Sequence, residues 1–245
     1  MVPAVILAAG MGRRIASRTN GGPKALLELH GRTLLDRAID AIRRAGFSEV
    51  VVVTGHAAEL IRPTLASSAG LTITERWNPE FDTANNIVSL MTASDRMGKG
   101  FCLLNCDITF DPTILAELAG LDSGNWMVVD GDEPLGAEEM KVVLDDRGLV
   151  SRVSKLIDPS TAVGEFIGMS RFDEAGAAML GASASRLLSA GDRQLYYEDA
   201  IDASAAELAV RAMWTRNRPW TEIDDDADFE RALQVAAMLD GQAAR

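Results

Sequence analysis

Short apolar runs alternate with longer amphipathic segments through the first half of the chain, and this alternation limits the possible folds more than any other feature of the sequence. The apolar runs are rich in valine, isoleucine and leucine, which is typical of strands buried in a parallel sheet. The amphipathic segments repeat apolar residues at helical spacing. Units of this kind joined by short links predict an α/β fold, with a mostly parallel sheet flanked by helices. The predicted strands occupy 2–9, 49–55, 70–76 and 100–108, and the predicted helices 33–46, 57–67, 84–97 and 111–120.

Two of the predicted helices carry clear start signals. Thr33 and Asp36 have the spacing of a capping box, and Gly46 stands where that helix would end. Asp111 precedes Pro112, a residue that is favoured at the first position of a helix. These signals predict where both helices begin.

The pattern changes after about residue 125, where predicted strands follow one another more closely. The segment after residue 140 has an Asp-Arg-Gly turn between two apolar runs, which is typical of a hairpin. We find no repeat and no low-complexity linker, so we predict a single domain, 1–245, with a β-rich acceptor lobe at approximately 126–215. The predicted elements are strands at 126–132, 141–155 and 164–172, a helix at 173–191, and a strand end followed by an acid-capped helix at 219–239.

Charge and composition exclude several classes of function. Acidic residues outnumber basic residues by 36 to 24, so the net charge is −12 and nucleic acid is not expected as a partner. No apolar stretch reaches the roughly 18 residues of a membrane span, and the N-terminus does not read as a signal peptide. Cys102 and Cys106 would lie roughly 13 Å apart along a strand, too far for a disulfide. Reduced thiols predict a cytoplasmic protein, and the lack of a long apolar stretch predicts that no membrane is a partner.

A loop with two glycines follows the first predicted strand. Ligands of open parallel sheets bind beyond the carboxyl ends of the strands, so this loop is the expected binding place. Gly10 and Gly12 would let the backbone approach a ligand and direct N–H groups at an anion. Ile15 stands where a dinucleotide-binding fingerprint has its third glycine, and the Gly-Lys-Ser/Thr of a P-loop is missing. The loop therefore predicts a phosphate site of another kind.

Charged residues near this edge point to transfer of a phosphorylated group. Arg14 and Lys24 would neutralise the charge of a triphosphate, as such a transfer requires. Asp107 and Asp224 each end a predicted strand, and carboxylates suit a hard cation such as Mg²⁺. Sequence alone does not pair these two aspartates, and Glu222 beside them stays undecided. The remaining acids of that segment are assigned to the first turn of the last helix: Asp225, Asp226 and Asp228.

The string Leu-Ala-Ala-Gly-Met-Gly-Arg-Arg, followed by Pro-Lys-Ala-Leu-Leu, resembles the signature of the nucleotidyltransferase (NTP transferase) family. The resemblance implies a Rossmann-like sheet of the GT-A-like nucleotidyltransferase fold. It implies that Arg14 holds the β- and γ-phosphates and that Lys24 contacts the α-phosphate. It also places the catalytic Mg²⁺ on Asp107 and Asp224. The loop residues implied to bind the nucleotide are Leu7, Ala8, Ala9, Gly10, Met11 and Gly12.

The segment Asn-Asn-Ile-Val-Ser-Leu resembles one branch of this family, the cytidylyltransferases that act on phosphocholine, related phospho-compounds or phosphonates. The resemblance implies CTP as donor and a small phosphorylated or phosphonate acceptor, with release of pyrophosphate. It places Asn85, Asn86 and Ser89 near the nucleotide or the acceptor. A homodimer is compatible with it.

The acceptor itself stays open between two chemistries. The chain has few aromatic residues, and Ile87-Val88 stand where the phosphocholine enzymes have aromatics, which disfavours a quaternary ammonium. The tyrosine pair and acids at 196–199 would receive an amine, although one tyrosine is expected to be core. The cations of the hairpin region would instead hold an anionic acceptor. The residues assigned to the acceptor are Lys141, Lys155, Glu165, Tyr197 and Glu198, with Lys141 favoured among the cations.

Two alternative functions remain. The same chemistry could use a sugar 1-phosphate with UTP, CTP or dTTP, although the Asn-Asn segment favours the cytidylyltransferase branch. The second alternative is a nucleotide-sensing module that has lost catalytic activity. The joint presence of the loop cations and both aspartates disfavours this alternative.

Overall fold

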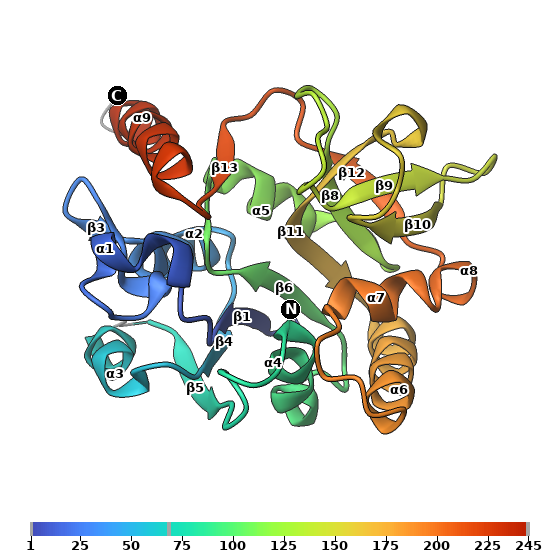
Figure 1. Ribbon diagram of the computed structural model, residues 1–245, viewed down its shortest axis with the longest axis horizontal. Coiled ribbons are helices and arrows are strands. Elements are labelled where there is room, and N and C mark those ends of the chain that lie inside the picture. Colours follow the sequence, from blue (N-terminus) through green and yellow to red (C-terminus); the bar gives the residue numbers. More distant parts are fainter. Residues whose placement is uncertain (1, 68–69, 244–245) are drawn as a thin grey trace.

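The computed structural model describes residues 2–67 and 70–243, and within them nine strands form one mixed sheet (Figure 1). The strands are β1 Ala4–Ala8, β4 Glu49–Thr54, β5 Thr72–Trp77, β6 Phe101–Asn105, β8 Trp126–Asp130, β9 Lys141–Leu144, β10 Val150–Ser154, β11 Gly164–Phe172 and β12 Arg211–Trp214. One half, β6-β1-β4-β5, is parallel, as the alternating pattern predicts. β11 joins β6 in the antiparallel direction and links the parallel half to the other strands. The predicted α/β sheet is confirmed.

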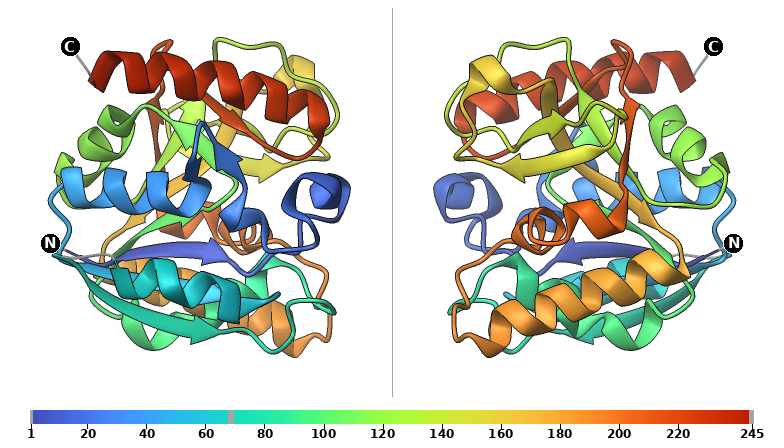
Figure 2. Two further views of the ribbon diagram at one scale, coloured as in Figure 1. Left: turned by 90° about the vertical axis from the view of Figure 1, so that its left-hand side faces the viewer. Right: turned by 90° about the vertical axis from the view of Figure 1, so that its right-hand side faces the viewer.

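Helices cover both faces of this sheet and give the molecule three layers (Figure 2). Side chains alternate between the faces along each strand. Ile6 and Val52 therefore pack against α2 and α5, whereas Val5 and Val51 face α4, α6 and α7. The helices are α1 Ala16–Thr19, α2 Leu34–Arg44, α3 Ala58–Ser67, α4 Asn86–Thr92, α5 Pro112–Gly120, α6 Glu174–Ser189, α7 Tyr197–Asp202, α8 Ala205–Leu208 and α9 Asp226–Ala243.

The predicted helix starts are confirmed. The hydroxyl of Thr33 accepts from the N–H of Asp36 at 3.0 Å, and the Asp36 carboxylate accepts from the N–H of Thr33 at 3.2 Å. The Asp111 carboxylate accepts from the N–H of Thr113 at the start of α5. The helix predicted at 84–97 is shorter: α4 ends at Thr92, and a 3₁₀ turn follows at Ser94–Arg96. In the last turn of α4 the Thr92 hydroxyl donates to the carbonyl of Val88, and a side-chain bond of this kind weakens the helix.

Strands between residues 126 and 215 continue the same sheet. β9 and β10 form the predicted hairpin, and β9 pairs with β11. β12, which the sequence pattern does not predict, lies parallel to β8 at one side. The apolar pattern does not reveal β12, because the strand has four residues and only Met213 among them is buried. The predicted acceptor lobe is therefore built on strands hydrogen-bonded to the rest of the sheet.

A separate two-stranded ribbon brings two distant parts of the chain together. β7 (Ile108–Phe110) pairs with β13 (Trp220–Glu222) in the antiparallel direction, with Ile108 opposite Glu222. The N–H of Ile223 also donates to the carbonyl of Asp107 at 3.0 Å. This ribbon places the chain after β6 beside the chain that leads into α9. A second ribbon, β2 (Glu28–Leu29) with β3 (Arg32–Thr33), precedes α2.

Both cysteines are buried free thiols, as predicted. Burial raises the pKa of Cys102 to about 12, so this thiol stays protonated. Within 2–67 and 70–243, no helix has the length and apolar character that crossing a bilayer requires.

Candidate active site

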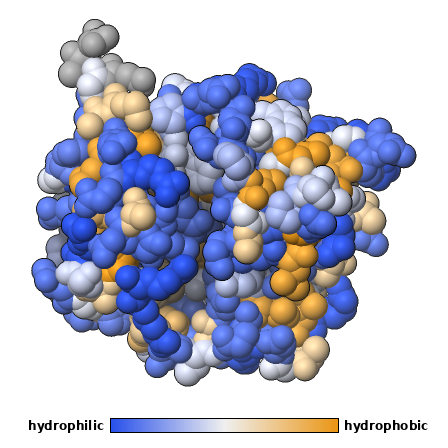
Figure 3. Space-filling model, turned by 45° about the horizontal axis from the view of Figure 1, so that its top comes forward, coloured by the Kyte–Doolittle hydropathy of each residue, from blue (hydrophilic) through white to orange (hydrophobic). Residues whose placement is uncertain are grey.

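A cavity of about 320 Å³ opens at the carboxyl ends of β1 and β6, where an open α/β sheet is expected to bind its ligand. The space-filling view shows hydrophilic walls around a cleft between the two halves of the molecule (Figure 3). Most of the residues that line the cavity are polar or charged. They include Arg14, Asn85, Asn86, Ser89, Asn105, Asp107, Lys155, Glu198, Glu222 and Asp224.

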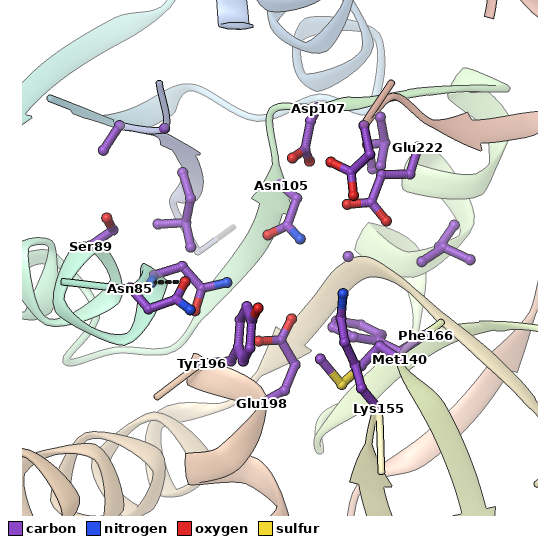
Figure 4. Close-up of a pocket in the computed structure, with 18 of the residues that line it drawn as sticks. Asn85, Ser89, Asn105, Asp107, Met140, Lys155, Phe166, Tyr196, Glu198 and Glu222 are labelled. Atoms are coloured by element: carbon purple, nitrogen blue, oxygen red, sulfur yellow. Dashed lines mark hydrogen bonds between the residues drawn. The ribbon is translucent and has the colours of Figure 1, made fainter. Parts of the chain in front are cut away.

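Three carboxylates and one ammonium group meet at one end of this cavity. Lys24 lies between the two predicted aspartates: its Nζ donates to Asp107 Oδ2 at 3.0 Å and to Asp224 Oδ1 at 2.8 Å. Arg14 donates to the other oxygen of Asp224 at 2.6 Å. Carboxylate oxygens of Asp107, Glu222 and Asp224 lie within 4.8 Å of one another, and Figure 4 shows the first two of these side chains. The fold thus brings together the four charged residues that the sequence assigned to chemistry and adds Glu222.

The pKa values in this cluster show how strongly its charges interact. Burial opposes the positive charge of Lys24, but Asp107 and Asp224 outweigh it and raise the pKa of Lys24 above its usual value. Burial would also raise the pKa of Asp224, but the charge and hydrogen bond of Lys24 hold it below its usual value. Burial, with Asp107 and Asp224 close by, raises the pKa of Glu222 to about 8.

One oxygen of this cluster has no hydrogen-bond partner. Asp107 Oδ1 is buried, and nothing in the described part of the chain donates to it. Leaving a buried carboxylate oxygen unpaired is costly unless a cation or donor binds it. Three acidic side chains with oxygen ligands, one of them unpaired, fit a hard divalent cation such as Mg²⁺.

The glycine loop lies beside this cluster. Gly12 adopts a left-handed conformation with φ of +59°, and a Cβ there would lie 3.0 Å from the Cβ of Lys24. Glycine therefore lets the loop pack directly on the lysine stem. Of the loop residues assigned to the nucleotide, Leu7, Ala9 and Gly10 line the main cavity. Ala8 lines a small pocket behind it, and neither pocket includes Met11 or Gly12.

The start of α4 forms the opposite wall. Asn85 caps α4, and its amide nitrogen donates to the carbonyl of Gln194 at 3.1 Å. Asn86 accepts from the N–H of Tyr197 at 2.7 Å, which ties α4 to α7. Ser89 accepts from Asn78 at 3.1 Å. All three residues predicted from the Asn-Asn segment, Asn85, Asn86 and Ser89, line the cavity.

The five residues assigned to the acceptor separate into three groups. Lys155 and Glu198 line the cavity, from the end of β10 and from α7. Glu165 lines an adjoining acidic pocket that also includes Glu222, and burial with nearby Glu139 raises its pKa to about 7. Tyr197 is fully buried behind the cavity wall, and its neighbour Tyr196 lines the cavity instead. The expectation that one of these tyrosines belongs to the core is confirmed.

Lys141 is the assigned cation that the structure places elsewhere. Its side chain is 1% exposed and is not part of the cavity lining. Its Nζ donates to the carbonyls of Gly136, Ala137 and Glu139 at 3.0–3.3 Å. The preference for Lys141 as the acceptor's cation is thus corrected, because its ammonium group is hydrogen-bonded to carbonyls of the loop before β9 and is not available to a ligand. Sequence cannot distinguish this role, since the carbonyls come from an irregular segment.

Replacing Lys141 with methionine should therefore lower stability rather than chemistry. Three carbonyls would lose a charged donor, so we expect the free energy of unfolding to fall by about 2 kcal/mol or more. Chemical denaturation measures that loss, and steady-state kinetics at saturating substrates should show turnover retained. A fall in turnover with stability unchanged would contradict the structural role.

Sequence reasoning missed several residues of the cavity. Asn105 lies two positions before Asp107 at the end of β6, and this spacing on a strand that ends at the site was the available signal. Met140 and Phe166 form an apolar part of the lining near Lys155 (Figure 4). Nothing in the local pattern around these two distinguishes them from core residues.

Comparisons with known proteins agree with this geometry. A family model described as the MobA-like NTP transferase domain matches residues 4–154, more than half of the 245-residue chain. The CMP-5'-(3-aminopropyl)phosphonate synthase of Streptomyces rubellomurinus is 29% identical over 243 residues, covering 94% of this chain and 38% of that protein. The 2-aminoethylphosphonate cytidylyltransferase of Lancefieldella rimae is 25% identical over 243 residues, covering 92% of this chain and 89% of that protein.

The fold has a close structural counterpart. A solved structure of the CTP:phosphocholine cytidylyltransferase of Streptococcus pneumoniae matches with a TM-score of 0.82 at 20% identity, covering 96% of this chain and 99% of the other. This likeness confirms the predicted nucleotidyltransferase-like fold. The chain spans less than half the length of the Streptomyces relative and most of the Lancefieldella relative.

Proposed function

The chain belongs to the family of MobA-like NTP transferase domains, and from this premise we propose that it transfers CMP from CTP to a small phosphorylated or phosphonate acceptor and releases pyrophosphate. One observation carries the proposal. Lys24 lies between Asp107 and Asp224 beside the glycine loop, at the edge of the sheet where a triphosphate would bind. This is the arrangement of positive charge and cation ligands that nucleotidyl transfer requires.

Asp107, Glu222 and Asp224 would together hold Mg²⁺, as their clustered oxygens and the unpaired Asp107 Oδ1 suggest. When bound, this ion would neutralise part of the negative charge on the nucleotide and on the acceptor. Mg²⁺ keeps several of its waters and needs only a few carboxylates, as this cluster offers, whereas Ca²⁺ is usually surrounded by a larger set of protein oxygens.

The chain's own residues would then act by positioning and neutralisation. The backbone around Gly10 would cradle the nucleotide, and Arg14, whose side chain is 60% exposed, would reach the β- and γ-phosphates. Lys24 would offset charge at the α-phosphate. An acceptor oxygen attacks the α-phosphorus in line, a new P–O bond forms, and the bond to pyrophosphate breaks. That oxygen is already ionised at neutral pH, so no side chain has to remove a proton.

For the acceptor, we propose a phosphonate or phosphate that carries a primary amine. Glu198 is 4% exposed and lines the cavity, and its Oε2 has no hydrogen-bond partner among the described residues. A buried carboxylate oxygen of this kind suits an ammonium group, which offers three donors. The two relatives named above are described by aminoalkylphosphonates. Tyr196 lies beside Glu198 (Figure 4), and within the described residues no ring contact joins it to Phe81 or Phe166, the other aromatics of the lining. These rings therefore do not form the aromatic cage that favours a quaternary ammonium.

Pyrophosphate release is the direct test of this function. The assay would supply Mg²⁺, either CTP or UTP, and one acceptor from a panel of 2-aminoethylphosphonate, 3-aminopropylphosphonate, phosphocholine, a carboxylated phosphonate and glucose 1-phosphate. We expect turnover with CTP and an aminoalkylphosphonate. Turnover only with the sugar phosphate would support the alternative sugar nucleotidylyltransferase, and nucleotide binding without release in any mixture would support a sensing module.

The acceptor's amine gives this proposal a pH dependence. Burial raises the pKa of Glu198 to about 7. The ammonium group is bound by the ionised carboxylate, which is the major form above that pH and is lost below it. We therefore expect the acceptor KM to rise as pH falls from 8 to 6. Glu198→Gln should raise this KM about tenfold or more and remove that part of the pH profile, because its amide does not titrate.

Protonation of the acceptor's phosphonate would also alter the profile, and the variant separates the two causes. A profile that is identical in the wild type and in Glu198→Gln would assign the pH dependence to the substrate. It would contradict the role of Glu198.

A further inference from the structure

Asn105 is the cavity residue whose environment demands an explanation. Its side chain lies between Asp107 and Glu222 on one side and Tyr196 and Glu198 on the other (Figure 4). An acceptor whose amine binds Glu198 and whose phosphonate lies near Asp107 and Glu222 would therefore lie alongside Asn105.

The amide of Asn105 has a fixed orientation. The hydroxyl of Tyr197 donates to Asn105 Oδ1 at 3.2 Å. The other end of the amide, Nδ2, makes no hydrogen bond within residues 2–67 and 70–243. With its oxygen engaged, Asn105 presents its amino group as the free donor.

Gly168 of β11 lies directly against the Asn105 side chain and limits its movement. A Cβ at Gly168 would lie 2.7 Å from Asn105 Nδ2 and 3.0 Å from Asn105 Cγ. The strand has a register irregularity at this point, and Gly168 has φ of +79°. The Asn105 amide thus packs against the backbone of Gly168, in space that the Cβ of any other residue at position 168 would occupy.

Tyr197 is held too firmly to follow the amide if it turns. It is fully buried, its ring contacts that of Phe166 edge-on at 6.3 Å, and its N–H donates to Asn86. Its hydroxyl is therefore a stationary donor. It cannot touch the acceptor itself, because it is not part of the cavity lining.

We infer that Asn105 is a further acceptor-binding residue, which donates its amide N–H to an oxygen of the acceptor's phosphonate, and that Tyr197 is the positioning residue that holds this donor toward the cavity. The inference rests on the proposed function, since it assumes an acceptor in this cavity. It assigns Tyr197 an indirect role in place of the direct contact expected from the sequence.

Tyr197→Phe tests the inference with the least disturbance, because it removes only the hydroxyl, whose polar neighbours are Asn105 and the Glu198 carboxyl. Without that donor the amide can turn and present its oxygen to the phosphonate. We expect the KM for 2-aminoethylphosphonate to rise about tenfold, the loss expected for one hydrogen bond to a charged group. The KM for CTP and kcat at saturating acceptor should not change, a split that a general loss of structure would not produce.

A double-mutant cycle connects the two residues. Asn105→Ala should raise the acceptor KM at least as much as Tyr197→Phe. The Tyr197 hydroxyl also interacts with the Glu198 carboxyl, so the cycle is measured in a Glu198→Gln background, where the double variant should match Asn105→Ala alone. Ser204→Ala is the matched control: its hydroxyl is also buried beside α7 and donates to the carbonyl of Ala200, but it lies outside the cavity. The control should lose some thermal stability and keep the wild-type acceptor KM.

Binding of 2-aminoethylphosphonate by calorimetry distinguishes failure of this inference from failure of the proposed function. Asn105-dependent and Tyr197-dependent binding without any pyrophosphate release would uphold the inference and refute the transferase. Normal turnover with an unchanged acceptor KM in Tyr197→Phe, or additive effects in the double variant, would overturn the inference. A wild type with neither binding nor turnover would refute both.

Discussion

Lys24→Met is expected to lower turnover by about 10³-fold, because one preorganised charge that stabilises the transition state is removed while the stem of the side chain is kept. The ammonium is nine-tenths buried and contacts both aspartates, and within the described residues Asp107 has no other ion-pair partner. Pyrophosphate release at saturating CTP and acceptor measures the loss, and circular dichroism checks that the fold survives.

The same variant should bind the divalent cation more tightly when nucleotide is absent. Lys24 and the cation compete for the same carboxylate oxygens, so removing the ammonium frees them. Manganese titration followed by electron paramagnetic resonance reports this directly, without any turnover. Lys99→Met is the control, since Lys99 is exposed and forms no ion pair in the described residues. Turnover near that of the wild type in Lys24→Met would refute the assigned role.

Asp107→Asn should reduce turnover to a similar or greater extent, by about 10³-fold or more. Asparagine keeps the shape of the side chain but removes the charge that Lys24 and a divalent cation share. We therefore also expect manganese affinity to fall, opposite to the expectation for Lys24→Met. Opposite shifts of metal affinity with the same loss of turnover would identify Asp107 as a ligand and Lys24 as its internal counter-ion.

Asp111→Asn is the matched control for that change. It lies four residues later, at the start of α5, and its carboxylate caps the helix. Asparagine caps a helix about as well as aspartate, so stability and turnover should both be kept. If Asp107→Asn behaves like Asp111→Asn, with metal affinity and turnover retained, then Asp107 holds no cation.

The sequence by itself determined the features that depend on neighbouring residues. The alternation of apolar runs was sufficient for the parallel half of the sheet, because burial of both strand faces is visible within six residues of chain. The cap at Thr33 and the acidic start of α9, where Asp225 accepts from the N–H of Asp228, were also visible, since caps act within one turn. The glycine loop and its two cations predicted a phosphate site at the edge of the sheet where the cavity opens.

Only the tertiary structure decided which distant residues meet. Asp224 joins Asp107 because β13 pairs with β7, and three-residue strands have no pattern that specifies their partner. Lys141 lies outside the site because loop carbonyls bind its ammonium group. Tyr197 is buried behind the cavity wall, whereas Tyr196 and Glu198 line the cavity. A residue's type and spacing predict what its side chain can do. The packing of separate segments decides which side chains face the ligand, and that depends on contacts between residues far apart in the chain.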